Sequence, residues 1–357
     1  MKFRNLLFFL LCSFALIGAF SSCSDDDDEA SWKAGSKVEL PNNRAFVLTE
    51  GSNGNNNSHL YFYNADVDTT SNFDIYLAQN GKKLGDTGND MLTYGGDIYI
   101  VMNASKYVVR LNGAGMEQAR YSFDDKLGQP RFAVVDNDKL YVTSYGGYVV
   151  RLNVKTLSFE DTVKVDKNPE EIIAYQGNLY CVNSGYGKGH TMSIINEESF
   201  NSSKSVGIVS NPYGLKEANG HIYIQSYDAS YNSLVCSYDV SSQKCDTIGY
   251  GSRIFAYGDK LYMANSTSKN WVNYTSTFSV YDALTKKTSE WDLTKAPSVL
   301  ASSIIYMVER NPYTGDFYIG TTDYYSDGTV YRFGSDGVYK TKFSAGGINP
   351  NSMVFLR

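Results

Sequence analysis

An internal repeat limits the fold of this chain more than any other feature of its sequence. A three-residue core, made of a turn residue, an apolar residue and a tyrosine, recurs at spacings of 39 to 56 residues. Its tyrosines are Tyr99, Tyr141, Tyr180, Tyr223, Tyr262 and Tyr318. A tight turn such as Tyr94-Gly95-Gly96-Asp97 precedes each core, and Gly or Asn in such turns supplies the positive φ that short hairpins require. A repeat of this length, with four short strands per unit, predicts the blades of a β-propeller.

The two ends of the repeat region complement one another. Residues 349–355 are similar to the inner strand of a repeat unit, and residues 44–49 are similar to a second strand. Residues 58–63 and 73–77 then follow as the third and fourth strands. The sequence therefore predicts an all-β, seven-bladed β-propeller whose ring is closed by strands from both termini, which leaves no open sheet edge. A pair of β-sandwiches is the alternative, and the single period running through the domain argues against it.

Composition agrees with many short strands. The chain has 30 Tyr and 31 Gly but only 7 Pro, a balance that suits strands and turns better than long helices. Its formal net charge is −6, and no basic patch is evident in the sequence. We therefore expect no nucleic-acid partner.

The N-terminal segment predicts export and lipidation. Lys2 and Arg4 precede an apolar run over residues 6–20, and Ser21 and Ser22 precede Cys23, as in a lipoprotein signal peptide. We expect residues 1–22 to be removed, residues 23–40 to form a lipid anchor and tether, and residues 41–357 to form the propeller. An ordinary cleaved signal with an incidental cysteine is the alternative. Acylation of Cys23 would hold the protein at a membrane without a transmembrane helix.

A run of acidic residues follows the predicted lipidation site. Residues 24–29 read Ser-Asp-Asp-Asp-Asp-Glu, a like-charged segment that repels itself and stays solvated. It resembles the export signal that sends Bacteroides-type lipoproteins to the outer face of the outer membrane. A plain spacer and a calcium site are the alternatives, but adjacent carboxylates lack the alternating spacing that surrounds an ion. We expect a lipid-anchored protein exposed on the cell surface.

Three cysteines remain for the folded domain. Cys12 lies in the signal and Cys23 takes the lipid, which leaves Cys181, Cys236 and Cys245. Cys236 and Cys245 flank a short hairpin and are predicted to form a disulfide, which an exported location permits, while two free thiols are the alternative. Cys181 is expected to be a buried thiol.

Propeller topology predicts which residues share a face. The inner strand and its neighbour are joined by a hairpin on one face, so the longer loops gather on the other face. These loops are rich in Tyr, Trp, Asn and Gly, which suits a binding surface for a bulky, partly polar ligand. Packing of the tyrosines on one another is the alternative for any single residue. The candidate ligand-binding residues are Tyr145, Tyr186, Tyr227, Tyr231, Trp271, Tyr274, Tyr324, Arg131 and Arg253.

The sequence offers little for catalysis. The only histidines are His59, His190 and His221, and no nucleophile elbow, metal-binding cysteine pair or phosphate-binding loop is present. Asp90, Glu170 and Glu171 are carboxylates that could act in sugar chemistry, but the sequence does not give the spacing between them. We expect no enzyme activity, no catalytic residue, no metal site and no catalytic cofactor.

Two segments carry a family resemblance. Residues 83–91, followed by Tyr94-Gly95-Gly96-Asp97, and residues 46–57 resemble the YncE-like propeller lipoproteins of Bacteroides. Among these, the pattern is similar to the BtuG-type surface proteins. The resemblance implies capture of cobalamin or another corrinoid and its delivery to a TonB-dependent outer-membrane transporter. A surface adhesion or glycan-binding propeller and a propeller lyase or hydrolase are the alternatives.

Overall fold

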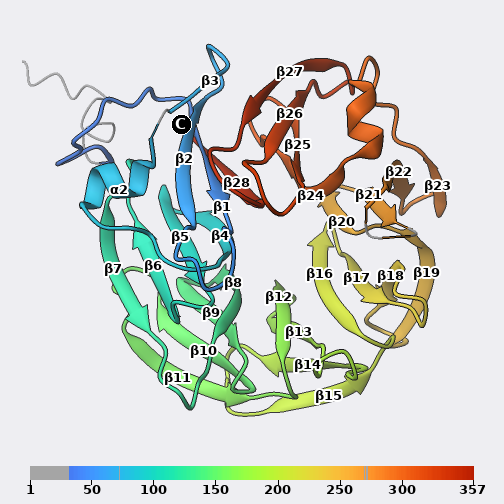
Figure 1. Cartoon of the computed structure of the whole chain (residues 1–357). Coiled ribbons are helices and arrows are strands. Elements are labelled where there is room, and N and C mark those ends of the chain that lie inside the picture. Colours follow the sequence, from blue (N-terminus) through green and yellow to red (C-terminus); the bar gives the residue numbers. More distant parts are fainter. Residues whose placement is uncertain (1–31, 72, 269, 271) are drawn as a thin grey trace, which may run out of the picture.

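The chain forms a ring of seven blades. The computed structural model describes residues 32–357 except 72, 269 and 271. In this part of the chain seven four-stranded antiparallel sheets surround a central axis (Figure 1). The predicted all-β, seven-bladed β-propeller is confirmed. Cys23 and the acidic run lie outside the described residues, so the lipid anchor stays a prediction.

Each blade runs from an inner strand to an outer strand. Blade 1 consists of β4 (Gly88–Tyr94), β5 (Asp97–Met102), β6 (Tyr107–Leu111) and β7 (Glu117–Ser122). Blade 2 consists of β8 (Pro130–Asp136), β9 (Lys139–Ser144), β10 (Tyr148–Asn153) and β11 (Phe159–Lys164). Blade 3 consists of β12 (Pro169–Tyr175), β13 (Asn178–Asn183), β14 (Thr191–Asn196) and β15 (Ser203–Gly207). Blade 4 consists of β16 (Pro212–Ala218), β17 (His221–Tyr227), β18 (Ser233–Asp239) and β19 (Lys244–Tyr250).

The remaining blades complete the circle. Blade 5 consists of β20 (Arg253–Tyr257), β21 (Lys260–Ser268), β22 (Tyr274–Asp282) and β23 (Lys287–Glu290). Blade 6 consists of β24 (Ile304–Arg310), β25 (Phe317–Thr322), β26 (Thr329–Phe333) and β27 (Tyr339–Ser344), and a 3-10 turn, η1 (Ser298–Ser302), precedes it. The closing blade has the order β28 (Pro350–Leu356), β1 (Arg44–Thr49), β2 (His59–Asn64) and β3 (Thr69–Thr70).

Two-residue turns join the first two strands of blades 1 to 5. In blade 1, Tyr94 pairs with Asp97 across Gly95 and Gly96, which have φ of 59° and 83°. These values are the left-handed conformation that such hairpins need and that glycine adopts without strain. Blade 6 differs from the prediction because β24 ends at Arg310 and β25 begins only at Phe317, so its connection is longer.

The predicted ring closure is confirmed. β28 and β1 pair antiparallel, with Phe46 opposite Val354. The predicted fourth strand at residues 73–77 is wrong, because β3 occupies that place and Ile75–Asn80 form the helix α2. The Asp74 side chain accepts a hydrogen bond from the Leu77 N–H at the start of α2, and Gly81 with φ of 69° ends it. These two caps favour a helix over a strand.

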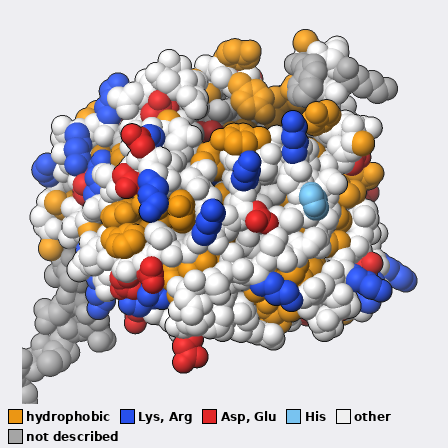
Figure 2. Space-filling model, turned by 90° about the horizontal axis from the view of Figure 1, so that it is seen from below, with side chains coloured by type: hydrophobic (Ala, Val, Ile, Leu, Met, Phe, Trp, Pro, Cys, Tyr) orange, Lys and Arg blue, Asp and Glu red, His pale blue; other side chains and the backbone are white. Residues whose placement is uncertain are grey.

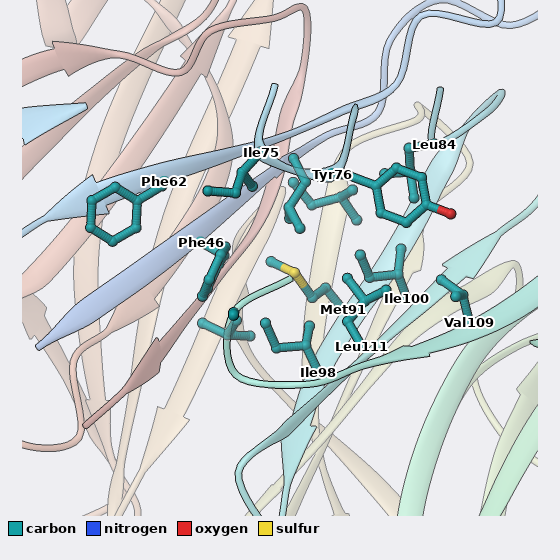
Figure 3. Packing of buried hydrophobic residues seen from close by; sticks show 14 of the residues in the cluster. Phe46, Phe62, Ile75, Tyr76, Leu84, Met91, Ile98, Ile100, Val109 and Leu111 are labelled. Atoms are coloured by element: carbon teal, nitrogen blue, oxygen red, sulfur yellow. The ribbon is translucent and has the colours of Figure 1, made fainter. Parts of the chain in front are cut away.

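The hydrophobic core lies between neighbouring blades rather than in the channel. Where the closing blade meets blade 1, apolar side chains of β1, β2, α2 and blade 1 interdigitate (Figure 3). The labelled members are Phe46, Phe62, Ile75, Tyr76, Leu84, Met91, Ile98, Ile100, Val109 and Leu111. Similar clusters occupy the other blade junctions, so each blade is stabilised by its neighbours and the ring is the cooperative unit.

The predicted disulfide is absent. Cys181, Cys236 and Cys245 are all free thiols. Cys236 lies opposite Thr247, whereas Cys245 lies opposite Tyr238, so the two cysteines occupy diagonal positions on β18 and β19. Diagonal neighbours in an antiparallel pair are about 7–8 Å apart, which exceeds the usual span of a disulfide.

The side of the ring seen in Figure 2 is polar and mixed in charge. Figure 2 shows Lys and Arg side chains interspersed with Asp and Glu and with small hydrophobic patches. Within residues 32–357, as far as they are described, no helix is both long and apolar enough to cross a membrane.

Candidate ligand site at the channel mouth

The inner strands enclose a cavity of about 640 Å³ around the ring axis. Residues from β4, β8, β12, β16, β20, β24 and β28 line it, so all seven blades contribute. We call the end of the ring with the two-residue turns the hairpin face and the opposite end the loop face. The cavity opens at the loop face, and we call this opening the mouth. The polar lining residues of the mouth are Glu50, Asn89, Arg131, Glu170, Tyr213, Gln225, Tyr227, Arg253, Tyr306 and Asn351. A concave site with a few convergent polar groups is the usual form of a small-molecule site.

Three of the inner strands begin with an Asn-Pro step at this mouth. Asn168, Asn211 and Asn349 each precede the proline that starts an inner strand, and their φ values are 51°, 58° and 60°. Asn tolerates this left-handed conformation better than most residues. The Asn211 carbonyl accepts a hydrogen bond of 3.1 Å from the Tyr227 N–H, and the Asn349 carbonyl accepts one of 2.9 Å from the Glu50 N–H. The step therefore fixes both the inner strand and the end of the second strand at the channel mouth.

Arg131 belongs to a fully bonded network. Its guanidinium donates to the Glu170 carboxylate at 2.9 Å and to the Asn89 side chain. Glu170 is buried and also accepts hydrogen bonds from the Tyr145 hydroxyl at 3.0 Å and the Ser184 hydroxyl at 2.9 Å. Burial acts to lower the pKa of Arg131, but the Glu170 charge outweighs it and raises that pKa. The network holds Arg131 rigid and neutralises it.

Arg253 is held differently on the other side of the mouth. Its Nε donates to the Tyr306 carbonyl at 2.6 Å, and its Nη1 donates to the Ser252 carbonyl at 2.8 Å. Its guanidinium carbon lies 4.5 Å from the centre of the Tyr306 ring, and the Tyr306 hydroxyl donates to Glu50. Among the described residues, no carboxylate forms an ion pair with Arg253. Its charge is therefore available to a ligand.

Tyrosines surround these charges. Tyr213 and Tyr227 are stacked with ring centres 4.4 Å apart, and Tyr306 meets the edge of Tyr324 at 5.9 Å. Burial raises the pKa of Tyr213 and of Tyr306, so both stay neutral at physiological pH. Neutral phenols offer flat apolar faces and hydrogen-bonding hydroxyls at the same site.

The predicted ligand residues differ in how closely they approach the cavity. Arg131, Arg253 and Tyr227 line the cavity, and Tyr145 and Tyr324 contact residues that do. Tyr274, at the start of β22, does not line the cavity; burial, and to a lesser extent Tyr274, raises the pKa of Tyr324. Tyr186 and Tyr231 lie on the predicted face but are 77% and 75% exposed, and neither lines the cavity. Trp271 lies outside the described residues.

The sequence-based site missed the cavity-lining residues Glu50, Gln225, Tyr306 and Asn351. Asn351 follows an Asn-Pro step as Glu170 and Tyr213 do, so that step is the signal that could have found it. No such step precedes Tyr306 in β24, and the repeat spacing is longest there.

A second polar cluster lies deeper in the channel. Lys216 donates to Glu171, and its side chain is 40% exposed to the channel. Burial raises the pKa of Asp90 to about 6, although the Ala133 N–H bonds to its carboxylate at 2.9 Å. Burial also raises the pKa of Glu309 to about 8, opposed by Lys216 and supported by Asp90 and Glu171. The cluster can hold a proton near neutral pH.

Among the described residues no group of three or more His, Cys, Asp or Glu is placed to bind a metal.

The fold and cavity together define a seven-bladed β-propeller with a small-molecule-sized site on its axis. The chain belongs to the family described as a domain of unknown function, DUF5074, whose match spans residues 43–345. No curated protein matches the sequence.

Solved structures of the same fold cover most of the chain. A protein assigned as a 6-phosphogluconolactonase from Bacteroides fragilis has 11% identity and a TM-score of 0.62, covering 91% of this chain and 99% of its own. The periplasmic gluconolactonase of Pseudomonas aeruginosa has 10% identity and a TM-score of 0.58, covering 88% and 99%. The dihydro-heme d1 dehydrogenase NirN in complex with DHE has 11% identity and a TM-score of 0.55, covering 90% and 77%. At such identities these similarities establish the fold alone.

Proposed function

We propose that this protein captures a ligand without chemical turnover and that the ligand is cobalamin or another corrinoid. One observation carries the proposal: Arg253, a cation with no carboxylate partner among the described residues, stands beside tyrosine rings at the mouth of a closed ring. A flat macrocycle with amide side chains fits such a mouth, because aromatic faces cover its apolar surface and guanidinium groups donate to amide oxygens.

The fold of one neighbour lends support. The dihydro-heme d1 dehydrogenase, whose name gives a haem derivative as substrate, is a structural neighbour of this chain. A haem derivative and a corrinoid are both large, flat macrocycles. The match concerns the fold, and corrinoid binding by this chain is proposed from its own mouth residues.

The proposal places the protein at the cell surface. Lipidation of Cys23 and the acidic run after it account for an outer-membrane anchor, and a TonB-dependent transporter would receive the ligand. This location follows from the sequence resemblance, and removing the anchor should leave ligand binding unchanged.

Calorimetric titration with cyanocobalamin tests the function. We expect saturable binding by the parent chain, a loss of about tenfold or more for Arg253→Gln, and no change for Lys139→Ala on the hairpin face. An absence of binding at micromolar concentrations contradicts the corrinoid assignment. Saturable binding of an oligosaccharide instead would favour the glycan-binding alternative.

Hydrolysis of a sugar lactone is the second candidate. The observation that favours it is the deeper cluster, where Asp90 and Glu309 have raised pKa values beside Lys216 and Glu171. A carboxyl group that exchanges its proton near neutral pH suits general acid–base chemistry. A pH-stat assay with glucono-δ-lactone decides: catalysed ring opening that Glu309→Gln abolishes would establish a hydrolase, and we expect none above the spontaneous rate.

A further inference from the structure

A second pocket lies on the hairpin face, where the closing blade meets blade 1. Its volume is about 480 Å³, and its lining includes Trp32, Arg44, Asp97, Arg110, Gly113 and Arg357. None of its lining residues belongs to the channel cavity described above. It is therefore independent of the proposed ligand site.

Ring closure explains why the space exists. In blades 1 to 5 a two-residue turn joins the inner strand to the second strand on this face. In the closing blade these strands come from opposite parts of the chain, with Leu356 opposite Arg44 and no turn between them (Figure 1). The segment at Trp32 and the Gly95-Gly96 turn of blade 1 flank the place that a turn would otherwise cover.

Arg44 puts an uncompensated positive charge in this pocket. The residue is only 3% exposed, yet its guanidinium bonds only to carbonyl oxygens, at 2.6 Å to Gly113 and 2.7 Å to Asn42. Its guanidinium carbon lies 3.4 Å from the centre of the Trp32 ring. No carboxylate of the described residues pairs with it, and burial lowers its pKa to about 10. A buried cation without a counter-charge is costly, and a bound anion would remove that cost.

The other charges of the pocket indicate which anion fits. Arg110 pairs with Asp97 at 2.6 Å, so the side chains of Arg44, Arg110, Arg357 and Asp97 together carry a formal charge of +2. A phosphate monoester carries about −1.5 to −2 at neutral pH, whereas a carboxylate carries one negative charge. Guanidinium groups also bind phosphate in a bidentate manner.

We propose that this pocket binds a phosphate group. The pocket has room beside Trp32 for the organic part of the ligand, since small-molecule sites typically measure about 300–1,000 Å³. A soluble phosphomonoester and a lipid headgroup share this chemistry. Binding of a lipid headgroup would hold the hairpin face against the membrane.

Calorimetry on the purified chain tests the proposal with two probes, inorganic phosphate and a short-chain, water-soluble phosphatidylglycerol. Arg44→Met and Arg110→Gln should each weaken binding of either probe about tenfold, because each removes a charge-assisted contact. The matched control is Arg151→Gln, since Arg151 occupies in blade 2 the place of Arg110, pairs with Glu160 and lines none of the pockets described here. It should bind like the parent.

Because Arg44 is buried, Arg44→Met could fail to fold, so a second variant at an exposed residue is needed. Arg357 is exposed at the end of the chain, so Arg357→Ala should keep the parent melting temperature and still weaken phosphate binding several-fold.

The relative affinity of the two probes identifies the source of the phosphate group. Stronger binding of the lipid than of phosphate identifies a headgroup site, and equal or weaker binding of the lipid identifies a soluble phosphate site. The proposal is overturned if neither probe binds or if Arg151→Gln weakens binding as much as Arg110→Gln. Cyanocobalamin titration of the same variants should be unchanged, which separates this outcome from failure of the proposed function.

Discussion

The two arginines of the channel mouth occupy similar places and have opposite surroundings. Arg131 is paired with Glu170 and bonded to Asn89, and Glu170 in turn is bonded to Tyr145 and Ser184. Arg253 bonds to carbonyl oxygens and packs on Tyr306, with no carboxylate partner among the described residues. Arg131 is therefore part of the structure of the mouth, whereas the Arg253 charge has no acidic partner among the described residues.

The largest expected effect is on stability, at the paired arginine. Arg131→Gln leaves the buried Glu170 carboxylate without its counter-charge, which we expect to cost about 3 kcal/mol in the free energy of unfolding. Urea unfolding of the variant and the parent measures this difference in the free energy of unfolding. The double variant Arg131→Gln with Glu170→Gln should recover part of the loss. Equal stability of Arg131→Gln and the parent would contradict the structural role.

The next effect is on binding, at the unpaired arginine. Arg253→Gln removes a cation that no carboxylate needs, so we expect the free energy of unfolding to change by less than about 1 kcal/mol. Corrinoid binding should weaken by about 2 kcal/mol, as for a buried anchor of an interface. Calorimetry and urea unfolding on the same sample measure both. A variant that loses stability but keeps its affinity would reverse the roles of the two arginines.

The stacked tyrosines are expected to contribute less. Tyr227→Leu removes the ring that stacks on Tyr213, and we expect a loss of about 1 kcal/mol in corrinoid binding. Tyr186→Leu is the matched control, because Tyr186 is on the same face but far more exposed and outside the cavity lining. If both changes weaken binding equally, the ligand lies across the outer loops rather than in the mouth.

The repeat predicted the fold, including the closing of the ring by both termini, because blades 1 to 5 share the two-residue turn and blades 1 to 6 share the tyrosine of the second strand. The residues that line the cavity were predicted in part. Arg131, Arg253 and Tyr227 follow from topology, but the pairing of Arg131 with Glu170 depends on side chains from neighbouring blades, which no local pattern encodes. Helix α2 was missed because its caps, Asp74 and Gly81, outweigh the strand propensity of Ile75 and Tyr76.

Two carboxyl groups deeper in the channel differ in the same way, one having partners and the other none in the described part of the chain. Glu171 is bonded to Lys216 and to the Leu215 N–H, whereas Glu309 has no hydrogen-bond or ion-pair partner among the described residues. Burial raises the pKa of Glu309 from 4.5 to about 8, so the folded protein holds this proton more tightly than the unfolded chain does. Stability from this group is present below pH 4.5 and is lost as the pH rises toward 8. Glu309→Gln should therefore melt higher than the parent at pH 8.5, and melting scans should show that difference shrinking toward pH 5.

The smallest effect is expected at a partly exposed charge pair on the hairpin face. Lys139 pairs with Glu160 at 2.6 Å, and the two side chains are 36% and 22% exposed. Exposed pairs of this kind contribute roughly 0–1 kcal/mol to stability, because water and salt screen them and both side chains lose freedom. Lys139→Ala should thus change the free energy of unfolding by less than about 1 kcal/mol and leave corrinoid binding unchanged. Since Lys139 starts β9 at the end of the ring opposite the mouth, a loss of binding comparable to that of Arg253→Gln would show that ligand recognition does not depend on the mouth.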